Sequence, residues 1–322
     1  MAFDTILKLH RAVHASVNAE IVGKERVTDL AIVTLLCGGH MLLDDVPGTG
    51  KTVFAKQLAS ALSLDFGRVQ CVPDMLPSDL IGVNFFDMKL SEFRFVRGPI
   101  FTGVLLADEI NRAMPKTQSG LLECMEERQV SVDGVTYPLD DPFFVIATQN
   151  PVETKGTFDL LEAQLDRFLV KTSMGYPAHD ESVEILKRKF MAPSEPSELS
   201  RVSRETILLA KEELKSVYVH NDILHYATSL CEATRQGKDI LLGAGPRALI
   251  GLVAVARGFA AIAGRDYVLP DDVKTAAVPV LAHRLVFQNS LFRQRDMGQA
   301  RIEELLETMP VPSEQIDFRR RG

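Results

Sequence analysis

The segment LLDDVPGTGKT, residues 42–52, constrains this chain more than any other stretch of it. An apolar strand pattern precedes it and a helical pattern follows it, which is the context in which a glycine-rich loop binds phosphate. Gly48 and Gly50 permit a backbone that turns several N–H groups toward one phosphate, and the helix start adds its positive dipole end. Lys51 can reach the β- and γ-phosphates, and the Thr52 hydroxyl can bind Mg²⁺. The residues expected to contact the nucleotide here are Pro47, Gly48, Thr49, Gly50, Lys51, Thr52 and Val53.

Asp45 departs from the usual form of this loop, which has its first glycine at that position. The departure concerns the opening turn and leaves the stretch from Gly48 to Thr52 intact. The competing interpretation is a glycine-rich turn with a chance lysine. The strand and helix patterns on either side disfavour it.

Short apolar runs alternate with helical patterns between about residues 40 and 175, which predicts an α/β fold. Continuous apolar runs are typical of strands that are buried on both faces of a parallel sheet. The runs are 41–43, 69–72, 104–107, 143–147 and 168–170, and the helical patterns between them are 52–62 and 118–127.

Two segments interrupt this alternation and predict β-hairpins added to the parallel core. Residues 93–96 alternate strictly and end at Gly98-Pro99, and residues 129–139 alternate around Asp133-Gly134, a strong hairpin-turn signal. A decorated sheet edge and a loop that contacts a partner are equally compatible with these patterns.

A proline- and serine-rich break at 192–197 divides the chain, and the sequence beyond it is helical. We therefore predict an α/β core at 1–192 and a small all-α domain at 193–322. The predicted helices of the second domain are 204–216, 222–235, 246–263 and 271–285.

The apolar run that begins at Val104 ends in two carboxylates, Asp108 and Glu109. An acidic pair at the carboxyl end of a strand can meet the phosphate loop, because open α/β sheets bind ligands at that edge. Asp108 is then a candidate Mg²⁺ ligand, and Glu109 a candidate general base for an attacking water. Asn150, after the next predicted strand, is a weaker candidate for positioning that water, since Asn-Pro is also a common turn. The combination predicts ATP hydrolysis.

Composition excludes several classes of protein. Hydrophobic residues make up 46% and charged residues 25%, which argues against a disordered chain or a collagen-like repeat. The chain has 36 Lys and Arg against 43 Asp and Glu, a formal net charge of −7. This balance argues against an extended basic face for nucleic acid, although a local basic patch remains compatible with it.

The sequence predicts neither a membrane span nor a metal-binding cysteine motif. The most apolar stretch, 248–264, is interrupted by Arg257 and is too short to span a bilayer, and residues 1–14 lack a signal-peptide pattern. Four widely spaced cysteines are expected to be core thiols, and the chain is expected in a reducing cytoplasm. They are Cys37, Cys71, Cys124 and Cys231.

Five motifs together resemble the AAA+ ATPases, and specifically the MoxR family. They are VPGTGKT (46–52), LLADEINRA (105–113), ATQNP (147–151), EAQLDRF (162–168) and GAGPRA (243–248). The segments PSDLIG (77–82) and GPIF (98–101) resemble that family too. The similarity extends from about residue 21 to residue 284 in the order of the family. It implies a P-loop AAA+ core with hairpin inserts and a helical lid.

The resemblance also implies roles for residues outside the phosphate loop. Arg167 resembles the arginine finger that reaches the γ-phosphate of a neighbouring subunit, with Arg112 as a weaker alternative. Arg247 resembles the sensor-2 arginine at a helix start in the lid, which contacts nucleotide from above. Val22 and Gly23 resemble the segment that walls the adenine. Without the motifs, each arginine would be interpreted as a solvated or ion-paired surface residue.

The family resemblance implies a ring oligomer, expected to be a hexamer, that binds ATP and Mg²⁺ and remodels or activates a client. The client would be a separate chain, often one with a von Willebrand factor type A domain, such as a metalloenzyme awaiting its cofactor. In such proteins the two hairpins usually face the central pore.

Two other functions share these motifs. The first is a nucleotide-gated scaffold with little turnover, although Glu109 and Arg167 favour turnover. The second is a DNA-acting AAA+ protein, which Lys89, Arg94 and Arg97 near the first hairpin support slightly and the acidic balance opposes. Nucleic acid is therefore not the expected partner.

Overall fold

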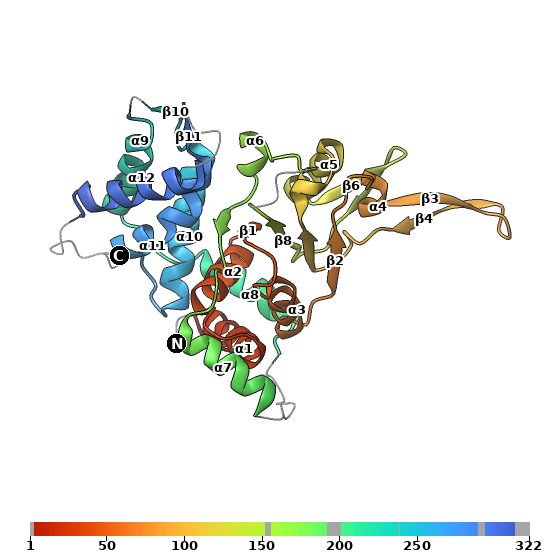
Figure 1. Cartoon of the computed structure of the whole chain (residues 1–322), viewed down its shortest axis with the longest axis horizontal. Helices are drawn as coiled ribbons and strands as arrows, with labels where there is room; N and C mark the ends of the chain where they lie inside the picture. Colours follow the sequence, from red (N-terminus) through yellow and green to blue (C-terminus); the bar gives the residue numbers. More distant parts are fainter. Residues whose placement is uncertain (1–2, 152–155, 192–200, 238, 289–293, 313–322) are drawn as a thin grey trace.

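The computed structural model describes residues 3–151, 156–191, 201–237, 239–288 and 294–312. Its centre is a five-stranded parallel sheet with strand order β2-β5-β8-β1-β9 (Figure 1). The sheet strands are β1 (Met41–Asp44), β2 (Phe66–Gln70), β5 (Val104–Asp108), β8 (Phe144–Gln149) and β9 (Val170–Thr172). The helices of the α/β part are α1 (Asp4–Glu20), α2 (Glu25–Leu36), α3 (Lys51–Ala61), α4 (Pro77–Ile81), η1 (Ile110–Arg112), α5 (Pro115–Glu127), α6 (Glu162–Leu165) and α7 (His179–Phe190).

Alternate side chains of each strand enter two different hydrophobic clusters, because successive residues of a strand point to opposite faces. Met41 and Leu43 of β1 pack with α1, α2 and α3, whereas Leu42 packs with α4 and α5 on the other face. In β5, Leu106 enters the same cluster as Met41 and Leu43, and Leu105 enters the same cluster as Leu42. Burial on both faces explains why these strands are continuous apolar runs in the sequence.

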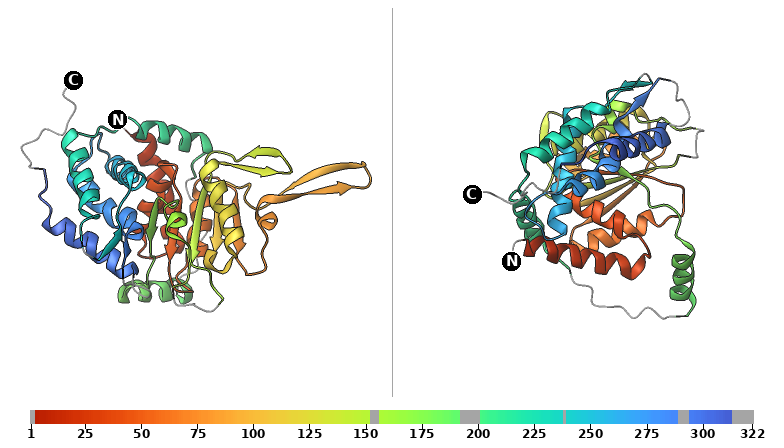
Figure 2. Two further views of the ribbon diagram at one scale, coloured as in Figure 1. Left: turned by 90° about the horizontal axis from the view of Figure 1, so that it is seen from above. Right: turned by 90° about the vertical axis from the view of Figure 1, so that its left-hand side faces the viewer.

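The two predicted hairpins are confirmed. The first pairs β3 (Gly82–Asp87) with β4 (Glu92–Arg97), and the second pairs β6 (Gln129–Val132) with β7 (Val135–Pro138) around Asp133-Gly134. Both extend from the same side of the core, and the β3–β4 hairpin reaches farthest from it (Figure 2).

The C-terminal part is helical, as predicted, and forms a second body beside β1 and β9 (Figure 1). Its elements are α8 (Arg204–Leu214), α9 (Asn221–Ala233), β10 (Ile240–Leu242), α10 (Pro246–Ile262), α11 (Pro270–Leu281), η2 (Ala282–Arg284), β11 (Val286–Phe287) and α12 (Gln294–Thr308). The predicted boundary at 192/193, within the proline- and serine-rich break, lies outside the described residues. Helix α8 packs against α1, so the first helix after the break still contacts the α/β part.

Two predicted strands are displaced from their observed positions. The run 69–72 predicted a strand, but the structure places β2 at 66–70. Apart from Val69, the residues of this edge strand are not buried, so apolar residues do not mark where the strand begins. The run 168–170 includes Phe168, whose side chain is buried but whose backbone belongs to the turn after α6. At both sites the apolar pattern correctly predicted buried side chains, Val69 and Phe168. It did not predict where the strand begins and ends, because buried residues there extend beyond the strand or cover only part of it.

The four cysteines are free, and Cys71, Cys124 and Cys231 are buried as expected, while Cys37 is partly buried. Burial raises the pKa of Cys37, Cys71 and Cys124 to about 12, and that of Cys231 to about 11. These thiols therefore stay protonated at neutral pH. Among the described residues, every helix is too short or too polar to cross a membrane.

Helix α10 packs closely on α2 at Gly258, where an added Cβ would lie 2.3 Å from Val33 Cγ1. We expect Gly258→Ala to destabilise the protein by roughly 1–3 kcal/mol, because overpacking forces the two helices apart. The urea midpoint measures this change. Gly120→Ala on α5 is the control, since a Cβ there meets Pro77 at an ordinary 3.6 Å. Equal midpoints for the two variants would contradict close packing of α10 on α2.

Candidate active site

The carboxyl edge of the sheet holds a cavity of about 420 Å³ beside the phosphate loop. Predicted site residues that line it are residues 47–53, Asp108, Glu109 and Asn150. They come from three separate parts of the chain, and parallel β1, β5 and β8 bring their ends to one edge. This is the edge at which open α/β sheets bind ligands.

The glycines of the phosphate loop have the backbone conformation that the sequence predicts. Gly48 has φ 84° and Gly50 has φ 87°, a backbone region that residues with a Cβ rarely adopt. Gly50 directly precedes α3, so the first N–H groups of that helix point toward the cavity edge. The Lys51 Nζ atom donates to the carbonyls of Asp45 (3.2 Å) and Val46 (2.8 Å).

Asp45, where the usual loop has glycine, anchors the opening turn. Its buried carboxylate accepts hydrogen bonds from Ser173 Oγ (2.7 Å) and from the N–H groups of Met174 and Gly175. These partners follow β9, so the side chain ties the loop to the neighbouring strand end. The departure therefore replaces a glycine turn with a hydrogen-bonded one.

Asp108, at the end of β5, is buried and held from two sides. Thr148 Oγ1 donates to its Oδ1 atom (2.7 Å), and Arg68 Nη2 pairs with its Oδ2 atom (2.8 Å). Thr52 lines the same cavity. A carboxylate and a hydroxyl are hard oxygen donors, which fit Mg²⁺.

Glu109 follows Asp108 with a left-handed backbone, φ 57°, which is uncommon for a residue other than glycine. Its N–H donates to Thr148 Oγ1 (2.8 Å), so one threonine orders both acidic residues. Its carboxylate accepts from Gln70 Nε2 (2.8 Å) and pairs with Arg112 Nη1 (3.2 Å). Arg112, the alternative finger, thus contacts the acid of its own chain.

Sequence reasoning missed Arg68, Gln70 and Thr148, which also line the cavity. Arg68 and Gln70 are polar residues at alternate positions of β2, and the predicted run 69–72 contains Gln70 but begins after Arg68. Thr148 lies within the ATQNP segment, in which the sequence analysis names only Asn150 as a candidate.

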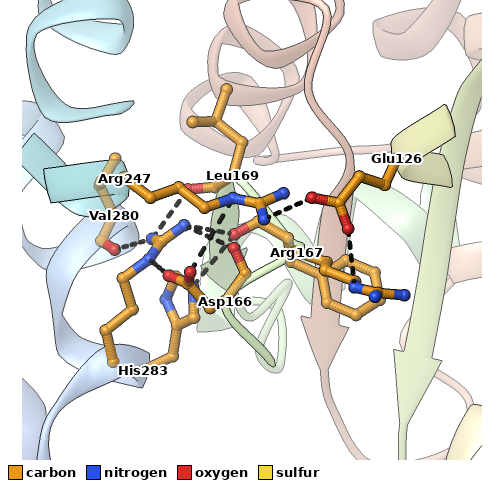
Figure 3. Close-up of polar contacts among 9 residues, drawn as sticks. Glu126, Asp166, Arg167, Leu169, Arg247, Val280 and His283 are labelled. Carbon is orange, nitrogen blue, oxygen red and sulfur yellow. Dashed lines mark hydrogen bonds and ion pairs between the residues drawn. The ribbon is translucent and has the colours of Figure 1, made fainter. Parts of the chain in front are cut away.

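Glu126 at the end of α5 accepts from both predicted arginines (Figure 3). Its Oε2 atom lies 3.0 Å from Arg167 Nε, and its Oε1 atom lies 2.9 Å from Arg247 Nη1. Asp166 pairs with Arg284 (Nε to Oδ1, 2.7 Å) and lies 3.9 Å from Arg247 Nε. Burial lowers the pKa of Arg284, and its hydrogen bond to Asp166 opposes that shift. We call these five residues the arginine cluster.

The arginine cluster lies at the amino edge of the sheet, opposite the phosphate loop. Arg167 precedes β9, whose Val170 is in register with Met41 at the start of β1, whereas the loop follows Asp44 at the end of β1. At about 3.3 Å per residue, these ends of β1 are roughly 10 Å apart. Neither Arg167 nor Arg247 lines the cavity of its own chain. Arg247, at the start of α10, pairs with Glu126 at the end of α5, and its contact with nucleotide stays a prediction.

Neither Val22 nor Gly23 of the predicted adenine segment lines this cavity. Gly23 has φ 72° and lies against Glu181 at the start of α7, where an added Cβ would come within 1.9 Å of the carboxylate. Helix α7, which the sequence analysis did not predict, occupies the space beside this glycine. The adenine contact of Val22 and Gly23 stays a prediction.

The chain matches two family models, which together cover both parts of the fold. The model of the ATPase family associated with various cellular activities (AAA) matches residues 40–170, and the AAA lid domain matches residues 232–305.

Individual relatives are similar over nearly the whole chain. The sequence is 42% identical to the Bacillus subtilis protein YeaC over 92% of both chains. It is 38% identical to the chaperone MoxR1 of Mycobacterium tuberculosis over 94% of this chain and 82% of that one. A crystal structure of a candidate ATPase from Cytophaga hutchinsonii superposes with a TM-score of 0.86 at 36% identity, over 96% of this chain and 98% of that one.

We expect Lys51→Ala to weaken ATP binding by about 10–100-fold or more, because a charge-assisted contact to phosphate contributes about 1.5–3 kcal/mol. Isothermal titration calorimetry measures the affinity. Lys56→Ala, an exposed lysine on the same helix α3, is the matched control and should bind as the wild type does. Wild-type affinity in Lys51→Ala would contradict the assignment of the phosphate loop.

Proposed function

Because this chain belongs to the MoxR family of AAA+ ATPases, we propose that it hydrolyses ATP between neighbouring copies of a ring. The ring is expected to be a hexamer, and turnover remodels or activates a separate partner protein. The observation that carries this proposal is the separation of the cavity from Arg167 and Arg247 at opposite edges of one sheet. In one chain the two arginines do not line the cavity, and we propose that a neighbouring copy brings the two sets of residues together.

Thr52 and Asp108 are the residues proposed to hold Mg²⁺ beside the β- and γ-phosphates. Both line the cavity, and their oxygen atoms suit this ion. When bound, Mg²⁺ neutralises charge on the phosphates during transfer. Besides the metal, Lys51 and the N–H groups of the loop provide positive charge next to the phosphates.

Glu109 is the proposed general base. It takes a proton from a water whose oxygen bonds to the γ-phosphorus, while the bond to the bridging oxygen breaks and releases ADP and phosphate. Thr148 fixes the backbone of Glu109, and Gln70 holds its carboxylate in the cavity. Asn150, which also lines the cavity, is proposed to orient the water.

Arg167 and Arg247 are proposed to act on the nucleotide of the next copy. A shared carboxylate, Glu126, keeps both guanidinium groups at one surface, so the two can approach a neighbouring phosphate together. Positive charge there stabilises the charge that spreads over the transferred phosphoryl oxygens.

The β3–β4 hairpin is the proposed contact with the client. Its side chains Met88 and Phe93 are 79% and 73% exposed, which is costly unless a partner covers them. The M. tuberculosis relative is named a chaperone, which supports a protein client; one with a von Willebrand factor type A domain is expected. The free thiols fit the expected cytoplasmic location.

The ion pairs of Arg94 on this hairpin disfavour a DNA-acting protein. Arg94 pairs with Glu92 at 3.2 Å and lies 3.8 Å from Asp87, so its charge is compensated on the hairpin itself. Phosphate contacts need uncompensated positive charge.

We expect Glu109→Gln to lower steady-state phosphate release by about 10²–10⁴-fold, because the amide cannot accept the proton of water. Nucleotide affinity should stay close to that of the wild type. Glu303→Gln, an exposed glutamate on α12, is the control. Equal turnover in Glu109→Gln and the wild type would leave a nucleotide-gated scaffold as the function.

We expect Arg167→Ala to bind ATP and to lose at least about 10³-fold in hydrolysis. Mixing it with Glu109→Gln should restore activity, because about a quarter of the interfaces in a random ring then have both groups intact. Arg201→Ala, an exposed arginine, controls for loss of charge. A mixture that stays as inactive as its components would contradict action between copies.

A further inference from the structure

Two histidines and an aspartate converge on the face where α1 packs against α2, away from the nucleotide cavity. His10 and His14 are one turn apart on α1, so both point from the same side of that helix. Asp29 comes from α2. The Nε2 atoms of both histidines lie 2.7 Å from one atom, Asp29 Oδ1. These three residues do not take part in the proposed hydrolysis.

The three side chains have the chemistry and the spacing of a metal-binding set. Their ligand atoms all lie within 4.8 Å of one another. Tetrahedral coordination at about 2.0–2.2 Å places neighbouring ligand atoms about 3.3–3.6 Å apart. Each histidine Nε2 now lies 2.7 Å from Asp29 Oδ1, so the side chains must separate slightly to admit an ion. Two imidazole nitrogens and one carboxylate oxygen favour Zn²⁺ and its first-row neighbours over Mg²⁺ or Ca²⁺, which prefer oxygen alone.

The site is open to solvent on one side. The side chains of His10, His14 and Asp29 are 25%, 17% and 31% exposed, so an ion can enter without unfolding of the helices.

We propose that His10, His14 and Asp29 bind one divalent transition-metal ion of the Zn²⁺ class, with a fourth position left for water. Three protein ligands and an open position leave that ion exchangeable. Bound metal joins α1 to α2. Helix α1 packs on α3, which follows the phosphate loop, and α2 packs on the lid helix α10. The ion thereby stabilises the junction between the nucleotide site and the lid.

The test uses the full-length chain without nucleotide, titrated with ZnCl₂ by calorimetry and with Co²⁺ by visible absorption. We expect one Zn²⁺ per chain with a dissociation constant at or below about 10 µM, and Co²⁺ bands of a four-coordinate N/O site. A hundredfold excess of free Zn²⁺ over the dissociation constant should raise the thermal midpoint by roughly 2–5 °C.

The double variant His10→Ala/His14→Ala should lose the Co²⁺ bands and at least tenfold in Zn²⁺ affinity. Asp29→Asn, which keeps the shape of the side chain, should also lose Zn²⁺ affinity. This variant tests the site even if the double variant fails to fold. His225→Ala, an exposed histidine on α9, should bind as the wild type does. Wild-type protein without saturable Zn²⁺ binding, or ligand variants that retain wild-type affinity, would overturn the proposal and leave a hydrogen-bonded contact between two helices.

This test is independent of the proposed hydrolysis. Lys51→Ala should bind Zn²⁺ normally, because the phosphate loop contributes no ligand to this site. Loss of Zn²⁺ binding in Lys51→Ala would assign the metal to the nucleotide cavity and overturn the proposal.

Discussion

Parallel pairing of the sheet strands is the constraint on which the site depends. Strands β1, β5 and β8 run in one direction, so the residues that follow them meet at one edge. Lys51, Asp108 and Asn150 are far apart in the sequence and line one cavity for this reason. The same pairing places Arg167, which precedes β9, at the other edge. Strand direction thus places the cavity and Arg167 at opposite edges of the sheet, which is the separation on which the proposed function rests.

Buried polar groups at the site are held by hydrogen bonds between distant segments. Thr148 donates to Asp108 and accepts from the backbone of Glu109, while Asp45 ties the loop opening to the end of β9. Unpaired groups of this kind would be costly to bury. The same bonds fix the positions of the acidic residues before substrate arrives, which lowers the cost of organising the site during reaction.

Local patterns predicted the elements whose conformation is set locally. The sheet, both hairpins and the helical lid agree with the apolar periodicity, and Gly48 and Gly50 have the backbone that their loop requires. The prediction was least accurate where burial is one-sided, as at β2, which is an edge strand. The apolar patterns did not predict helices α1, α2 and α7, and Glu181 of α7 lies against Gly23 of the predicted adenine segment.

The sequence by itself determined the phosphate loop, the acidic strand end and the family, because each depends on residue types at short, fixed spacing. Only the tertiary structure decided which side chains pair: Glu126 with both arginines, Gln70 with Glu109, and Asp29 with two histidines. Such pairs join residues 15 or more positions apart on different elements. Their geometry follows from how helices and strands pack, and a pattern of residues at short spacing does not specify that packing.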